Sequence, residues 1–145
     1  MRLGPLRFLL ALLLLGPVGL FGLGCDDGVT PTLSNFRFDG PAEDSPLVLL
    51  LSVDFHDGDG DLAAGVMETF IDDRVTNAGA LGLTTLFLES GLSPAATDGT
   101  LRFVLELAFG VDAPDPGASF RLGVRATDGL LHTSSTQQIT LKLTE

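Results

Sequence analysis

The chain contains one cysteine, no tryptophan and no tyrosine, and only 8 of its 145 residues are lysine or arginine. Because Cys25 is the sole thiol, no disulfide can form within the chain, and its fold must be stabilised by packing or by a bound ion. The few basic residues stand against 19 acidic ones, which gives a formal net charge of −11. Such an acidic surface repels nucleic acid and attracts cations, so nucleic acid is excluded as a partner.

The N-terminal segment combines positive charge with an apolar run. Arg2 and Arg7 precede the apolar residues 8–21, and the small residue Gly24 leads directly to Cys25. A membrane-spanning helix needs roughly 20 apolar residues, and this run is shorter. The pattern is therefore typical of an export signal.

Gly24-Cys25 behind this run resembles the cleavage site of a bacterial lipoprotein signal peptide, although Gly22 stands where that pattern usually has leucine. The resemblance implies that residues 1–24 form the signal peptide and that Cys25 is the lipidation site. It also implies that residues 26–31 form a short polar tether to the domain. The alternatives are an ordinary secretory signal with an incidental cysteine, or an uncleaved anchor.

Processing before Cys25 changes the size and charge of the chain. It removes 24 of the 145 residues and leaves 121. The remaining chain keeps 6 of the 8 basic residues and all 19 acidic ones, which gives a net charge of −13. A chain of this length forms one domain with a real core. We assign that domain to residues 32–145.

Short apolar runs separated by glycine, proline, aspartate and asparagine fill this domain. Seven such runs predict an all-β fold, a seven-stranded antiparallel β-sandwich, which the resemblance described below makes Ig-like. The expected strands are 32–38, 47–56, 65–71, 81–88, 100–109, 119–127 and 135–143. We expect no amphipathic helix of useful length.

Period-two alternation predicts which side chains face the core. We expect burial of the alternate apolar residues, represented by Phe103, Leu105, Val124 and Leu141. The intervening basic residues should face water, namely Arg102, Arg121 and Lys142.

Two stretches carry a family resemblance: 53–62, with its Asp-Gly-Asp-Gly-Asp turn, and 120–129, with its Ala-Thr-Asp-Gly turn before the last strand. Together they resemble the Ig-like, cadherin-like modules of bacterial surface proteins. The resemblance implies adhesion, display or spacing, with calcium at some acidic turns. The absence of tryptophan and tyrosine points away from antibody-type domains, which use a buried tryptophan and a tyrosine corner.

The acidic turn is a candidate calcium site. Asp57, Asp59 and Asp61 alternate with glycines, and three carboxylates on a tight loop can converge on one hard cation. Glu68 falls at the twelfth position from Asp57, as in an EF-hand, but Leu62 occupies the sixth position, where that loop needs glycine. We therefore reject the EF-hand and leave Glu68 out of the ligand set.

Sandwich topology predicts a fourth ligand. When strand directions alternate, the loops after the second, fourth and sixth strands share one end. These loops are 57–64, 89–98 and 128–134, so we expect Asp128 near Asp57, Asp59 and Asp61. A calcium ion would relieve the repulsion among them, whereas a solvated turn without an ion is the alternative.

Catalytic patterns are weak. His56 and His132 fall at the same expected end and suggest a zinc site, but no third nitrogen or sulfur ligand accompanies them. Ser134 and Ser135 lie near His132 without a nucleophile-elbow motif. The neighbouring acids 72–73 suggest glycosidase chemistry, yet adjacent side chains on a strand or turn point apart.

The sequence thus predicts a lipid-anchored, non-catalytic binding or spacer module of the bacterial cell envelope, on the periplasmic side or the cell surface. Its expected partners are the membrane and envelope proteins or glycans, and its one candidate cofactor is calcium. Two alternatives stay open: a subunit of an envelope assembly that pairs through an exposed sheet edge, and a small metal-dependent hydrolase.

Overall fold

The computed structural model describes residues 29–108, 112, 115 and 117–142. Residues 1–24 and Cys25 therefore lie outside the described part. No helix among the described residues is long and apolar enough to cross a membrane.

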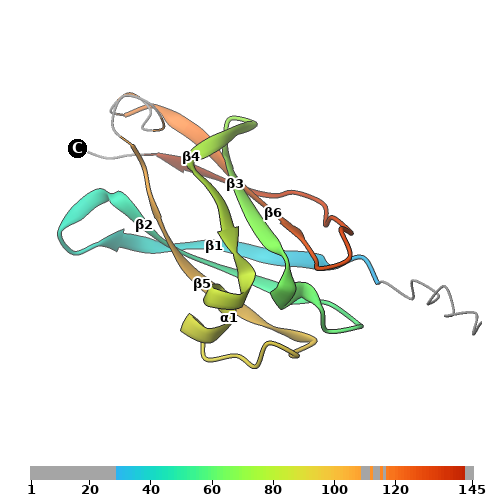
Figure 1. Cartoon of the computed structure of the whole chain (residues 1–145). Helices are drawn as coiled ribbons and strands as arrows, with labels where there is room; N and C mark the ends of the chain where they lie inside the picture. The colour runs from blue at the N-terminus through green and yellow to red at the C-terminus, as the bar shows by residue number, and fades with distance from the viewer. Residues whose placement is uncertain (1–28, 109–111, 113–114, 116, 143–145) are drawn as a thin grey trace, which may run out of the picture.

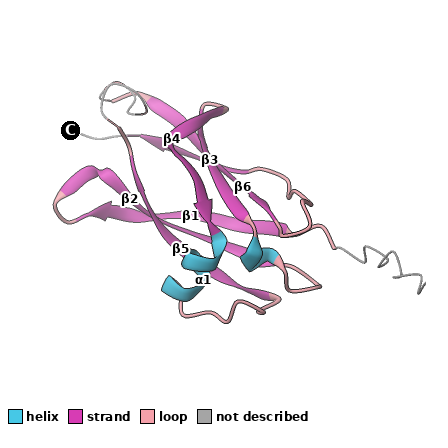
Figure 2. Ribbon diagram, viewed as in Figure 1, coloured by secondary structure: helices cyan, strands magenta, loops and turns pink. Residues whose placement is uncertain are grey.

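Seven antiparallel strands form two sheets that pack as a β-sandwich (Figures 1 and 2). The three-stranded sheet has the order β1-β2-β5, and the four-stranded sheet has the order β4-β3-β6-β7. The strands are β1 (Thr32–Ala42), β2 (Ser45–His56), β3 (Val66–Ile71), β4 (Arg74–Gly82), β5 (Asp98–Glu106), β6 (Ser119–Thr127) and β7 (Gln137–Lys142). The expected all-β sandwich is confirmed.

Three hairpins, β1–β2, β3–β4 and β6–β7, each stay within one sheet, while the other three connections cross between the sheets. The connection from β2 to β3 contains the acidic turn and one turn of 3-10 helix, η1 (Leu62–Ala64). The crossing connections bring residues that are distant in sequence to the ends of the sandwich.

The core lies between the inner faces of the two sheets, as the alternation predicts. Phe103, Leu105 and Val124 are buried, and Arg102, Arg121 and Lys142 are exposed. Leu141 is only half-buried, because β7 is an edge strand of its sheet.

The expected strand over residues 81–88 is wrong. The strand of this region is β4 (Arg74–Gly82), and the α-helix α1 (Leu83–Glu89) follows it at once. Leu83, Leu86 and Phe87 are all buried at helical spacing, and the Phe87 ring lies 4.9 Å from the Phe55 ring. The expectation of no useful helix is therefore also wrong, since one short helix closes this side of the core.

Candidate metal centre

The acidic loop, residues 57–64, begins where β2 ends. The backbone N–H of Asp57 donates to the Thr97 carbonyl at 2.7 Å, and Asp57 Oδ2 accepts the Leu62 N–H at 2.8 Å. These two bonds draw Asp57 inward until its side chain is fully buried. The loop is thereby closed around a carboxylate rather than extended into solvent.

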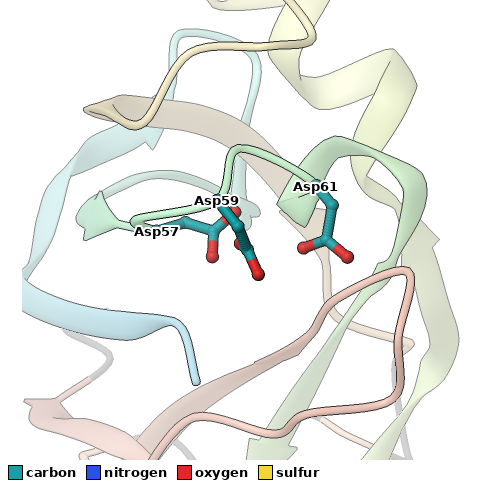
Figure 3. A group of neighbouring side chains, drawn as sticks. All are labelled: Asp57, Asp59 and Asp61. Atoms are coloured by element: carbon teal, nitrogen blue, oxygen red, sulfur yellow. The ribbon is translucent and has the colours of Figure 1, made fainter. Parts of the chain in front are cut away.

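Three carboxylates converge on this loop (Figure 3). One oxygen from each of Asp57, Asp59 and Asp61 lies within 4.8 Å of the others, the one such group found among the described residues. Asp57 is buried, Asp61 is half-buried and Asp59 is exposed. The expected convergence of these three residues is present.

Two of these carboxylates each carry a buried oxygen without a hydrogen-bond partner. They are Asp57 Oδ1 and Asp61 Oδ1, the two buried side-chain atoms in this condition within the described part of the chain. Buried acceptors are normally satisfied, because an unpaired one costs about 1–3 kcal/mol and more when charged. A cation between the carboxylates would satisfy both atoms.

The pKa values of the three carboxyl groups shift in different directions. Burial, followed by the neighbouring carboxylates, raises the pKa of both Asp57 and Asp61 above its usual value. The pKa of Asp59 is lowered, chiefly because its carboxylate accepts a backbone hydrogen bond from Val29. The site thus holds one readily ionised carboxylate beside two whose charges burial penalises.

Asp59 connects the cluster to the tether. The Val29 N–H donates to Asp59 Oδ2 at 3.0 Å. A Cβ added to Gly58 would lie 3.3 Å from the Val29 side chain, so Val29 rests on the acidic loop. In Figure 1 the blue start of the described chain lies between this loop and the red loop after β6.

The three loops expected at one end do meet there. A Cβ added to Gly60 would lie 3.2 Å from the Ala95 carbonyl oxygen. A Cβ added to Gly129 would lie 2.9 Å from the Ala64 side chain. The helix α1 does not alter this arrangement, because β4 already ends beside the acidic loop, where Leu83 N–H donates to the Gly65 carbonyl.

Asp128 lies at this end but bonds within its own loop. It is buried, and its Oδ1 accepts the N–H groups of Leu130 and His132 while Oδ2 pairs with His132 Nδ1 at 3.0 Å. Its charge still raises the pKa of Asp57 and Asp61. Asp128 thus acts on the cluster through its field, and direct ligation by Asp128 stays a prediction.

The two histidines lie outside the three-carboxylate group. His56 Nδ1 faces Asp98 Oδ1 at 3.6 Å on the surface, and His132 pairs with Asp128. The remaining candidates have structural bonds. Glu68 pairs with Arg125 at 2.6 Å, and Ser134 Oγ accepts the Ala126 N–H and donates to a backbone carbonyl.

The acids 72–73 form the β3–β4 turn, where both residues have positive φ. Asp72 Oδ1 accepts the Arg121 N–H at 2.9 Å, and Asp73 pairs with the Arg121 guanidinium. These bonds fix the turn against β6 and leave the pair in a structural role.

Comparison with known proteins gave no match: no protein-family model matches the chain, and no curated protein or solved structure is significantly similar to it.

The donor set suits a hard cation. Calcium takes six to eight oxygens at 2.3–2.6 Å in flexible geometry, and waters and backbone carbonyls commonly complete its shell. The three carboxylates here supply oxygen donors from one short loop, and two of them each have a buried oxygen that lacks any other partner. The residues present therefore fit a calcium ion.

Sequence reasoning missed two features of this end. The contact between Val29 and Asp59 joins residues 30 positions apart, and no pattern in the sequence marks it. The burial of Asp57 depends on the Thr97 carbonyl from another loop. Both features arise from the way the crossing loops pack together.

Proposed function

We propose that the chain is an exported, lipid-anchored β-sandwich module of the bacterial cell envelope that binds or spaces rather than catalyses. A calcium ion held by Asp57, Asp59 and Asp61 stiffens the end of the sandwich to which the tether connects. The observation that carries this proposal is the pair of partnerless buried oxygens, Asp57 Oδ1 and Asp61 Oδ1, beside the hydrogen bond from Val29 to Asp59.

The anchoring half of the proposal rests on the sequence around Cys25 and on the short length of the tether. Only three residues separate Cys25 from Val29, so a fully extended tether spans at most about 14 Å between them. A domain held so closely stands on its base, and rigidity at that base decides its orientation on the membrane. Calcium bound at the base supplies that rigidity.

The sheet edges bear on the alternative of an envelope assembly. Strands β4 and β5 are both edge strands, and each has a backbone N–H occupied by a side chain. Ser90 Oγ accepts the Arg102 N–H at 2.8 Å, and the Asp112 carboxylate accepts the Asn77 N–H at 3.1 Å. These side chains take one N–H on each of two of the four edge strands, which makes β4 and β5 less favourable templates for an added strand.

Calcium should raise the melting temperature of the wild-type protein, and magnesium should raise it less, because magnesium demands near-ideal octahedral geometry. The gain in stability is about 2.7 kcal/mol at one hundred times the dissociation constant. Scanning calorimetry of the full chain with calcium, magnesium or chelator at constant ionic strength measures it.

Asp59→Asn combined with Asp61→Asn should abolish the calcium effect. The matched control is Glu43→Gln with Asp44→Asn, which makes the same charge change on two residues of the β1–β2 turn, away from the acidic loop. This control should keep the full calcium effect. If the wild-type protein melts at the same temperature in calcium and in chelator, the acidic loop is only a solvated turn and the calcium proposal is wrong.

Cys25→Ser should release the protein from membranes or leave it unprocessed, because stable anchoring needs more than one acyl chain and the lipoprotein modification supplies several. Membrane fractionation with mass spectrometry of the N-terminus reads both effects. A wild-type chain that is wholly soluble and has an unmodified N-terminus would contradict the anchoring proposal.

A further inference from the structure

Two leucines are presented to solvent on the loop after β6, which we call the leucine loop (residues 128–134). Leu131 is 81% exposed and Leu130 is 55% exposed. Two adjacent leucines exposed to this degree form a small apolar patch that a contact with something apolar would bury.

The leucine loop is braced in this conformation. Asp128 Oδ1 accepts the N–H groups of Leu130 at 2.9 Å and His132 at 2.8 Å, and the Asp128 N–H donates to the His132 carbonyl at 3.0 Å. Leu131 is held at φ 72°, a left-handed conformation that a bulky side chain resists. The buried Asp128 carboxylate therefore fixes the leucine loop and holds Leu131 in a conformation that its side chain disfavours.

The leucine loop shares its end of the molecule with the tether and the acidic loop (Figure 1). An added Cβ on Gly129 would lie 3.6 Å from Asp61 Oδ2, and Val29, itself 45% exposed, donates to Asp59. The chain that precedes Val29 contains both Cys25 and the apolar run 8–21. Whether the lipid on Cys25 or the apolar run anchors the chain, the membrane then lies near this end of the domain.

We propose that Leu130 and Leu131 insert into the interface of the bilayer that anchors the chain. This inference rests on the proposed function, because the anchor supplies the proximity and the calcium ion lowers the negative charge of the acidic loop. Without an ion, the clustered carboxylates repel anionic head groups over the Debye length of about 8 Å at physiological ionic strength. With calcium bound, that repulsion falls and the leucines can reach the acyl boundary.

The absence of tryptophan from the chain provides a direct probe. Leu131→Trp places a single tryptophan on the leucine loop, and Val75→Trp places one on β4 at the opposite end, where the native residue is 54% exposed. The full chain is reconstituted into vesicles of phosphatidylcholine and phosphatidylglycerol, with and without brominated lipid. Emission is read in calcium and in chelator.

Emission from the Leu131→Trp variant should shift to shorter wavelength in vesicles with calcium, and brominated lipid should quench it several-fold more than it quenches the Val75→Trp variant. Chelator should reduce both effects. A further change, Leu130→Ser with Leu131→Trp, should weaken the quenching because it removes half of the inserting pair. Circular dichroism of every variant checks that the sandwich has folded.

Three results would overturn this proposal in whole or in part. If the Leu131→Trp chain floats with the vesicles but its emission stays as in water, the chain is anchored and the leucines do not insert. A shift to shorter wavelength that brominated lipid does not quench indicates a protein contact instead. A shift of equal size in calcium and in chelator would support insertion of the leucines but contradict the role of the ion in it. If the chain proves unacylated, excess vesicles are added and unshifted emission again overturns the insertion.

Discussion

Asp54 joins all three strands of its sheet through a single carboxylate. It lies on β2 and accepts hydrogen bonds from Arg37 and Asn35 on β1 and from Thr100 on β5, the last at 2.7 Å. The Arg37 hydrogen bond is the largest cause that lowers the pKa of Asp54 well below its usual value, followed by those from Thr100 and Asn35. The ionised form is therefore favoured by folding.

The sign of the resulting pH dependence follows from linkage. A carboxylate whose pKa is lowered in the folded state contributes stability above its usual pKa of 3.8, and that stability is lost as the pH falls through the folded value. We expect wild type to exceed Asp54→Asn in stability at pH 7 and the difference to shrink steadily below pH 3.8. Urea denaturation of both proteins from about pH 7 to about pH 2 measures it.

Arg37→Gln serves as the second variant, because it keeps the carboxylate and removes the main cause of the shift. It should weaken the acid dependence in the same direction as Asp54→Asn. A wild-type advantage that stays constant over the whole acid range would show that Asp54 acts only through packing.

The candidate metal centre shows how far residue spacing alone can predict a cluster of carboxylates. The alternation of Asp57, Asp59 and Asp61 with glycine was sufficient to predict a converging loop, and sandwich topology was sufficient to bring Asp128 near it. Spacing could not predict that Asp128 would bond to its own loop, because the same carboxylate can close a turn or bind an ion.

At the scale of elements, the prediction succeeds where a strand buries a regular alternation of apolar side chains and fails where it does not. Alternation along β5 and β6 is regular, and both strands were expected at nearly their observed positions. On β4 only Thr76 is buried, so that strand leaves no apolar alternation to detect. The apolar residues after it then look like a strand, although Leu83, Leu86 and Phe87 follow the spacing of a helix.

Gly65 marks the closest approach between two elements of the acidic end. A Cβ at this position would lie 1.8 Å from the Thr127 carbonyl oxygen and 2.8 Å from the Asp128 Cα. Both atoms belong to backbone, so neither can move without displacing the end of β6. Gly65→Ala should therefore lower the free energy of unfolding by at least about 3 kcal/mol, the upper end of ordinary overpacking.

Gly82→Ala is the matched control for this prediction. Gly82 joins β4 to α1 with φ −69° and ψ 120°, which any residue adopts, and an added Cβ would meet nothing within 4 Å. Its unfolding free energy should change by less than about 1 kcal/mol. Equal losses for the two variants would show that Gly65 does not approach the end of β6 as closely as described.

At the scale of the whole molecule, one end of the sandwich gathers the chain entry, the carboxylates and the exposed leucines. The opposite end carries the β1–β2 and β3–β4 turns, which hold charged side chains. This polarity gives the domain a defined base. If calcium binds at this base as proposed, a change in calcium concentration should alter how the whole domain stands on the membrane.

The hydrogen bond from Val29 to Asp59 allows that link to be measured. Coupling between two sites is reciprocal, so if calcium strengthens the contact of the tether, the contact must strengthen calcium binding by the same factor. Val29→Pro removes the donated N–H and changes no carboxylate, and the glycine before it tolerates a following proline. Val29→Ala keeps the N–H and removes only apolar contact with Gly58.

We expect Val29→Pro to weaken calcium binding about fivefold, the lower end of typical coupling, and Val29→Ala to leave it nearly unchanged. The physical reason is that the N–H fixes the Asp59 carboxylate toward Asp57 and Asp61, so that an ion need not order it. Titration calorimetry of the full-length variants gives the affinities, and hydrogen exchange at the Thr30 N–H, which every variant keeps, reports the order of the tether. Tighter binding in Val29→Pro would mean that the N–H competes with the ion for Asp59, and the tether would then be released by calcium rather than held by it.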